Sequence, residues 1–357
     1  MTKASTLPGL MASALAALVF VVPGSIGSAG AAVTRIPLEA APDQGNYLYK
    51  VQRGDTMKSI ANRYLLHSKD LGILLNLNRV PDANRLVLGS TVTIPRKLLM
   101  VVPARAVLAA YRGTVTLGGD KPAKVGSVVV EGARIETGPN SSASFTLEDG
   151  STVTLPSQSV IRIDRLRLVL ASGEMQQIFR LDDGKSQYAV APNRGPASKF
   201  EVRTPVSVSA VRGTEFRIGF AKTDASAVAE VVKDSVAVSA AGAQILVPQG
   251  FGAKSSALSV GTPIKLLPPP QVVLPIYHRP DGSLVFNIAP LEKAVRYKLQ
   301  IASDQGFQDL KNEGVNEKPS IVFASSPVGA FFVRVTAYDA NGLEGLPHVY
   351  PFVYNPR

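Results

Sequence analysis

The chain has 357 residues, and its 38 Lys and Arg against 27 Asp and Glu give a formal net charge of +11. This length exceeds one ordinary hydrophobic core, so two or three domains are expected. A composition that is 45% hydrophobic and 18% charged is typical of folded proteins and argues against intrinsic disorder. Cysteine is absent, which excludes disulfides and thiol chemistry.

The first 32 residues have the pattern of a secretory signal peptide. Lys3 precedes an apolar stretch, residues 10–22, which is followed by a Pro23-Gly24 break and small residues up to Ala32. The stretch is shorter than the ~20 residues that span a bilayer, so we expect cleavage near Ala32 and no stable membrane span afterwards. A retained anchor is the alternative. The expected location is the periplasm or cell envelope.

The basic excess lies in the first two thirds of the chain. Residues 47–99 contain nine Lys and Arg against three Asp and Glu, whereas residues 266–357 contain eight of each. Such a field attracts anionic polymers and membrane surfaces over about 8 Å. Solubility alone is the other interpretation. We do not expect nucleic-acid binding, because the chain carries an export signal and lacks interleaved basic and aromatic residues.

After a short polar linker, residues 33–46, comes a small patterned block, residues 47–96. A first amphipathic helix is predicted by apolar residues at helical spacing and by two candidate caps: Met57, Ile60, Ala61 and Tyr64, with Asp55 or Thr56. A second helix is expected from Ser68 toward Asn78, with short strands at 48–52 and 91–94. The predicted order is β, α, α, β.

This block resembles the LysM family. The resemblance is carried by Tyr49-Lys50-Val51-Gln52-Arg53-Gly54-Asp55-Thr56-Met57, Ile60-Ala61, Tyr64, Asn78, Pro81, Asn84, Gly89 and Ile94-Pro95. It implies a shallow groove that binds peptidoglycan or a related N-acetylglucosamine polymer, largely through backbone groups of two loops. Carried over by position, these loops are Gly54, Asp55, Thr56 and Met57 on one side and Pro81, Asp82, Ala83, Asn84 and Arg85 on the other.

The chemistry of an N-acetyl sugar agrees with such loops. Its amide and hydroxyls pair with backbone groups beside a helix N-terminus, and Met57 or Leu86 offers an apolar surface to the acetyl methyl group. The alternative is that Asp55 and Thr56 only cap a helix and that Asn84 only forms a turn. Leu65 stands where the family often has glycine, so the register of the second helix stays open.

Residues 103–265 are predicted to form an all-β domain of short alternating strands. Four turn sequences separate the strands: Gly118-Gly119-Asp120, Glu148-Asp149-Gly150-Ser151, Asp182-Asp183-Gly184-Lys185 and Ala240-Ala241-Gly242. A sandwich, a barrel and a rolled solenoid all fit this pattern.

The same region resembles the FecR family. The resemblance is carried by the segments 132–138, 141–145, 147–151, Val202-Arg203-Thr204-Pro205-Val206 and Val211-Arg212-Gly213-Thr214-Glu215-Phe216. It implies an envelope domain that contacts another protein. We expect neither the transmembrane part nor the cytoplasmic part that signalling needs in that family. Arg212 and Glu215 are expected to form a buried pair that stabilises a turn, with a contact site as the alternative.

A Pro-rich linker, residues 266–275, is expected to act as a stiff spacer, because Pro268-Pro269-Pro270 stops regular structure. The last region, residues 276–357, has alternating strands around Tyr297-Lys298-Leu299-Gln300-Ile301-Ala302 and Phe332-Val333-Arg334-Val335. It resembles a fibronectin type III β-sandwich.

No catalytic residue, metal site or cofactor is predicted. His67, His278 and His348 lie in three separate segments without zinc-ligand spacing. The acidic pairs Glu148-Asp149 and Asp182-Asp183 lie in predicted turns, which favours solvated turn residues over a glycosidase pair.

The sequence therefore predicts a mainly β multidomain protein, exported and non-catalytic, that binds peptidoglycan through the LysM-like block and contacts an envelope protein through the FecR-like domain. Two alternatives stay open: a signalling or assembly scaffold that binds only proteins, and a cell-wall-modifying enzyme with an unrecognised site.

Overall fold

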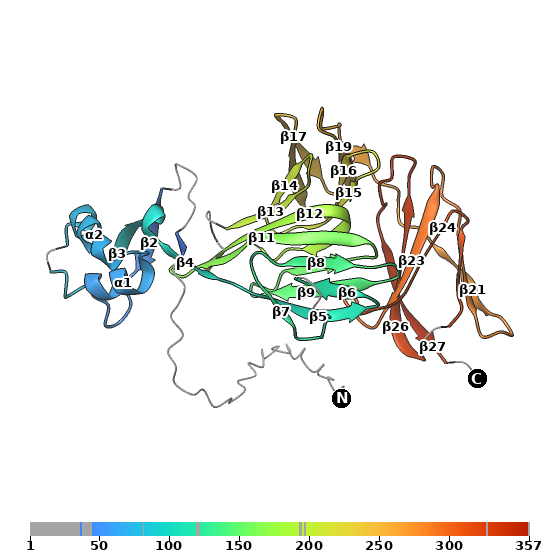
Figure 1. The fold of residues 1–357 in the computed structure, drawn as a ribbon, viewed down its shortest axis with the longest axis horizontal. Coiled ribbons are helices and arrows are strands. Elements are labelled where there is room, and N and C mark those ends of the chain that lie inside the picture. Colours follow the sequence, from blue (N-terminus) through green and yellow to red (C-terminus); the bar gives the residue numbers. More distant parts are fainter. Residues whose placement is uncertain are drawn as a thin grey trace, which may run out of the picture. The chain divides into compact units, whose positions relative to one another are not determined.

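The computed structural model describes residues 36–37, 45–80, 82–118, 122–192, 195, 198–325 and 328–355. The expected signal peptide and most of the expected linker lie outside these residues. The chain is mainly β, as predicted, and the α-helices among the described residues lie in the N-terminal block (Figure 1). Neither of these α-helices is long and apolar enough to cross a membrane, within the part of the chain that the structure describes.

The N-terminal block has the predicted order β, α, α, β. Its elements are β2 (Asn46–Lys50), α1 (Met57–Tyr64), the 3₁₀ turn Ser68–Asp70, α2 (Leu71–Asn78) and β3 (Thr91–Pro95). β2 and β3 pair antiparallel, with Leu48 opposite Thr93. Asn78 joins α2 to this pair, since its amide donates to the carbonyl of Thr93 at 2.9 Å and accepts from the Thr93 N–H at 2.7 Å.

The core of this block continues into the next region. Leu99, Val101 and Val169 are fully buried with the apolar residues of α1, α2 and β3. Arg96 forms an ion pair of 2.6 Å with Glu174, and both side chains are buried. The hydroxyl of Tyr47 donates to the carbonyl of Ala171 at 2.8 Å. No free linker therefore separates residues 47–96 from the β region that follows.

The middle region consists of two hydrogen-bonded layers of strands. The strands are β1 (Ile36–Pro37), β4 (Met100–Pro103), β5 (Ala106–Arg112), β6 (Val115–Leu117), β7 (Val128–Val129), β8 (Arg134–Thr137), β9 (Ser142–Leu147), β10 (Thr152–Leu155), β11 (Ser159–Val169), β12 (Glu174–Ala189), β13 (Lys199–Arg203), β14 (Val208–Val211), β15 (Glu215–Ala221), β16 (Ser226–Lys233), β17 (Ser235–Ala240), β18 (Ala243–Pro248), β19 (Phe251–Ser255) and β20 (Ile264–Lys265). One layer runs β8-β11-β12-β13-β14-β17-β18, with β6 beside β8, β4 beside β11 and β1 beside β4. The other runs β7-β5-β9-β10-β12-β15-β16-β19-β20.

β12 belongs to both layers, which corrects one sequence prediction. We expected a turn at residues 182–185, but they lie inside this strand of 16 residues. The first part of β12 pairs with β11 and β13, and from Gly184 onward it pairs with β15. Gly184 has φ +79°, and an added Cβ would lie 2.3 Å from the carbonyl oxygen of Gln158. Its Asp-Gly sequence therefore marks a change of layer and not a hairpin. The expected turns at 148–151 and 240–242 do join paired strands.

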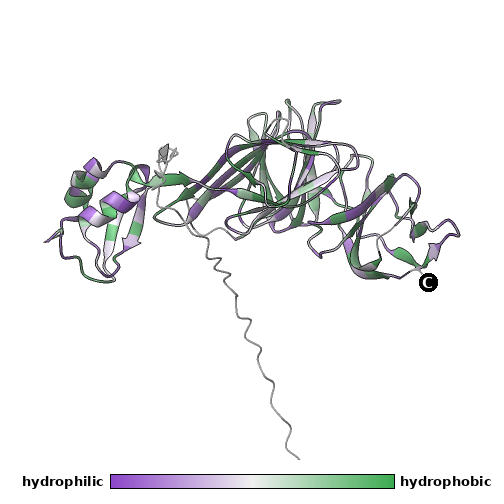
Figure 2. Cartoon of the chain, turned by 60° about the horizontal axis from the view of Figure 1, so that its bottom comes forward, coloured by the Kyte–Doolittle hydropathy of each residue, from purple (hydrophilic) through white to green (hydrophobic). Residues whose placement is uncertain are grey.

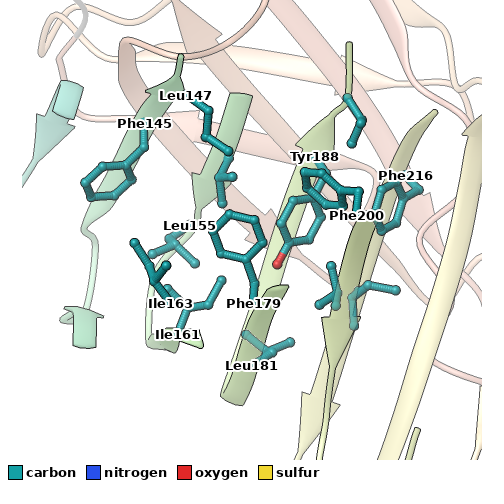
Figure 3. Close-up of a cluster of buried hydrophobic side chains, with 14 of the residues drawn as sticks. Phe145, Leu147, Leu155, Ile161, Ile163, Phe179, Leu181, Tyr188, Phe200 and Phe216 are labelled. Carbon is teal, nitrogen blue, oxygen red and sulfur yellow. The ribbon is translucent and has the colours of Figure 1, made fainter. Parts of the chain in front are cut away.

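The core of the middle region lies between the two layers (Figure 3). Apolar side chains from both layers meet there: Phe145, Leu147, Leu155, Ile161, Ile163, Phe179, Leu181, Tyr188, Phe200 and Phe216. The ring of Tyr188 stacks on Phe216 at 4.9 Å between centroids. Figure 2 shows hydrophobic and hydrophilic residues mixed along the strands.

The C-terminal region forms two sheets over one core. One sheet has the order β21-β22-β25, and the other has the order β24-β23-β26-β27. The strands are β21 (Val272–His278), β22 (Leu284–Ile288), β23 (Arg296–Ala302), β24 (Leu310–Asn316), β25 (Ser320–Phe323), β26 (Gly329–Tyr338) and β27 (His348–Tyr354). The expected Pro-rich spacer is attached to this sandwich, because the carbonyl of Leu267 accepts from the Leu346 N–H at 2.9 Å and β21 starts at Val272.

Candidate functional site

Thr56 is the N-cap of α1. Its hydroxyl accepts from the Ser59 N–H at 3.0 Å, and the Ser59 hydroxyl accepts from the Thr56 N–H at 2.9 Å. This reciprocal pair satisfies two backbone donors that a helix start leaves free. Of the two caps that the sequence allowed, the structure selects Thr56.

Asp55 has a different structural role. Its carboxylate is buried, with 6% of the residue exposed, and accepts from the Tyr49 hydroxyl at 2.7 Å and from the Gln52 N–H at 2.8 Å. Arg63 lies 3.3 Å from its other oxygen. Burial and the bond to Asp55 raise the pKa of Tyr49, so the phenol stays protonated as a donor. Asp55 thus fixes the loop before α1 from inside.

The two loops of the expected groove are joined by one backbone hydrogen bond. The N–H of Met57 donates to the carbonyl of Ala83 at 2.9 Å. The side chain of Met57 is fully buried in the core, so our expectation that it offers a surface to an acetyl group is wrong. The structure brings residues 54–57 and 82–85 together through their backbones.

The part of these loops that faces solvent is small and polar. Gly54, Asp82, Asn84 and Arg85 are exposed, whereas Thr56 and Ala83 are half-buried. Asp82 shapes its loop, because its carboxylate accepts from the Asn84 N–H at 2.8 Å and its carbonyl accepts from the Arg85 N–H at 3.2 Å. Pro81 lies outside the described residues. The side chains of Asn84 and Arg85 are therefore the best placed of the candidates to meet a ligand.

Residues 49–95 match the family model of the LysM domain, and residues 133–237 match that of FecR protein. The chain contains a LysM domain and a FecR domain. Both resemblances inferred from the sequence are thereby confirmed, while the likeness of the C-terminal region to fibronectin type III stays a prediction. LysM and FecR domains are binding or signalling domains of envelope proteins, not catalytic ones.

Similarity to individual proteins is distant. No curated protein matches the chain. Among solved structures, a candidate anti-sigma factor from Parabacteroides distasonis has 18% identity and a TM-score of 0.30, over 37% of this chain and 58% of that one. The extracellular domain of a candidate one-component system from B. thetaiotaomicron has 7% identity and a TM-score of 0.17, over 77% of this chain and 64% of that one. The chain spans less than two thirds of either structure.

Two residues of the most specific FecR segment, residues 211–216, have structural roles in this chain. Gly213 has φ +71°, and a Cβ added at this position would lie 3.0 Å from the Cα of Pro192. Thr214 is buried, and its hydroxyl lies 3.3 Å from the carbonyl of Ser235. Arg212 is exposed, so the expected buried pair with Glu215 is wrong. Gly213 and Thr214 hold the turn instead, and a contact site at Arg212 stays a prediction.

The acidic pairs have structural partners. Asp149 accepts from the Ser151 N–H at 3.0 Å and from the Gln177 amide at 2.8 Å. Asp183 accepts from the Gly184 N–H at 3.0 Å and lies 3.2 Å from the Lys222 ammonium. Among the described residues, no three His, Cys, Asp or Glu side chains group in a way that could hold a metal ion.

A buried charge cluster between the middle and C-terminal regions was not predicted. Arg217 of β15 lies 2.8 Å from Glu230 of β16 and 3.2 Å from Glu344, which precedes β27. Lys185 of β12 lies 3.0 Å from Glu230 and 2.8 Å from Glu344. The hydroxyl of Tyr338 donates to Glu344 at 2.9 Å. These residues are separated by up to 159 positions, so no local sequence pattern reveals the cluster.

Proposed function

We propose that this chain is an exported, non-catalytic envelope protein that holds peptidoglycan, or a related N-acetylglucosamine polymer, through its LysM domain. The hydrogen bond between Met57 and Ala83 carries this proposal, because it places both loops at one surface where Gly54, Asn84 and Arg85 are exposed. Backbone groups and the two polar side chains would pair with the amide and hydroxyls of the sugar. The FecR domain would contact another envelope protein.

The contact is expected to be weak on its own, because only a few polar groups are exposed at these loops. Several copies of the protein, or a second contact on the same wall, would raise retention strongly by avidity. The ion pair between Arg96 and Glu174 joins the LysM domain to the middle region, so a second contact on the middle region would act together with the glycan contact.

A sedimentation assay with purified sacculi tests the proposal. The chain from residue 33 onward is expected to sediment with sacculi. Asn84→Ala/Arg85→Ala is expected to reduce the affinity about 30-fold, since each of the two lost hydrogen bonds contributes about 1 kcal/mol. Neither side chain is buried, so thermal unfolding should be unchanged. Lys69→Ala/Asn76→Ala, on exposed positions of the same domain, is the matched control.

Two results would contradict the proposal. Equal sedimentation of the loop variant and the control variant would show that the loops do not take part in binding. Release of soluble muropeptides from the sacculi by the unmodified protein would show a cell-wall enzyme in place of a non-catalytic binder.

A further inference from the structure

Four arginines form one row across the first layer of the middle region. Arg134 of β8 is directly opposite Arg162 of β11, Arg162 is opposite Arg180 of β12, and Arg180 is opposite Arg203 of β13. These four strands lie side by side in Figure 1. Directly opposed residues project from the same face of a sheet, so all four side chains leave the sheet together.

The row lies on the outer face. Its chain neighbours Ile135, Ile161, Phe179 and Val202 are buried in the core between the layers, and the side-chain direction alternates along a strand. All four arginines keep exposed surface, with half of the Arg180 side chain accessible. At a strand spacing of about 4.8 Å the row is roughly 14 Å long.

Carboxylates flank the row on both sides but do not use all of its donors. Glu136 pairs with Arg134, Asp164 lies 2.9 Å from Arg180, and Glu201 lies 2.9 Å from Arg203. Arg162 has no ion-pair partner among the described residues. Each guanidinium has five N–H donors, and a single carboxylate occupies at most two of them well.

Like charges at directly opposed positions destabilise a sheet, and here they occupy four strands in succession. Packing does not require arginine on an exposed face. An anion lying along the row would offset this repulsion. A phosphate group suits the site better than a carboxylate, since it has more acceptor oxygens and can bridge two neighbouring guanidinium groups.

We propose that this arginine row binds a linear phosphate-bearing polymer of the cell envelope, in addition to the glycan contact of the LysM domain. The positive strip is one side chain wide, with Glu136 and Asp182 on one side and Asp164 and Glu201 on the other. A chain of phosphates fits along such a strip, whereas a flat anionic membrane would bring phosphates against the flanking carboxylates. The inference does not depend on glycan binding.

Binding of long-chain inorganic polyphosphate to the full chain tests this inference by fluorescence anisotropy. Arg162→Gln/Arg180→Gln is expected to weaken binding at least about tenfold, because two charge-assisted contacts are lost. Arg279→Gln/Lys318→Gln removes the same charge from exposed positions of the C-terminal region and should change the affinity less than about twofold. Binding should fall with added salt.

A second readout separates binding from folding. Polyphosphate should raise the unfolding temperature of the unmodified chain more than that of the arginine variant at the same polymer concentration, since stabilisation by a ligand grows with its affinity. Without polymer, the arginine variant should unfold at nearly the same temperature as the unmodified chain, because relief of repulsion along the row offsets the loss of the exposed Arg180–Asp164 ion pair.

Three outcomes overturn the inference. Equal polyphosphate affinity of the arginine and control variants would show that the row is not the site. Equal affinity for polyglutamate and polyphosphate would show that the protein binds any polyanion through its net charge. Row-dependent binding to vesicles of anionic phospholipid without binding to polyphosphate would make the partner a membrane.

Discussion

At the scale of single residues, the structure separates two roles that the sequence leaves mixed. Asp55 and Met57 belong to the matched LysM pattern, yet both side chains are buried and hold the loop from inside. Asn84 and Arg85 are exposed beside them. A residue pattern identifies the domain, but it does not tell which of its residues face the ligand, because burial depends on how the two loops pack.

Replacing Asp55 by alanine is expected to lower the free energy of unfolding by about 3 kcal/mol, since the Tyr49 hydroxyl and the Gln52 N–H lose a charged acceptor while partly buried. Urea unfolding of the full chain measures this loss. Asp82→Ala, on an exposed loop, should lower the free energy of unfolding by less than about 1 kcal/mol. Equal effects of the two changes would show that the buried network adds nothing.

At the scale of elements, alternation of hydropathy predicts strands well but does not say which strands pair. The segment Asp182-Asp183-Gly184-Lys185 has the composition of a hairpin turn. In the structure Gly184 lets one long strand leave the layer of β11 and enter the layer of β15. Both uses need a glycine with positive φ, so local sequence cannot distinguish them.

Gly184→Ala is expected to destabilise the protein by about 3 kcal/mol, because it combines an unfavourable φ with a clash against the carbonyl of Gln158. Gly173 has a similar φ of +70° but open space around it, so Gly173→Ala should remove only about 1 kcal/mol. Thermal denaturation compares the two. A smaller loss for Gly184→Ala than for Gly173→Ala would contradict the close approach.

At the scale of the whole molecule, the regions predicted from sequence as separate domains are joined by buried ion pairs. Arg96 with Glu174 links the LysM domain to the middle region, and Arg217 with Glu344 links the middle region to the C-terminal sandwich. Breaking a buried pair on one side leaves an unpaired charge and is strongly destabilising. These contacts favour cooperative unfolding over the independent unfolding expected of domains on spacers.

The buried charge cluster around Glu344 makes the free energy of unfolding depend on pH. Burial alone would raise the pKa of Glu344, but Lys185, Lys298 and Arg217 hold it well below its usual value. The ionised group therefore stabilises the fold above a pH of about 4.3, the ordinary value in an unfolded chain, and this contribution is lost as the pH falls toward the folded-state pKa.

Glu344→Gln is expected to lower stability at pH 7 by about 3 kcal/mol, and this difference from the unmodified chain should shrink below pH ~4. Urea midpoints at pH 7, 5 and 3 measure it. Glu317→Gln, at an exposed position of the same region, should have little effect at any pH. A difference that stays constant from pH 7 to pH 3 would exclude Glu344 as the titrating group.

The sequence alone determined the β, α, α, β block, the β-rich remainder, and the LysM and FecR identities, because these depend on periodicity and on residue patterns that are local in the chain. Tertiary structure decided which LysM residues face solvent, where β12 changes layer, how Glu344 meets Arg217, and how four arginines from separate strands form one row. Each of these depends on strand register and long-range packing, which bring together residues that are distant in sequence.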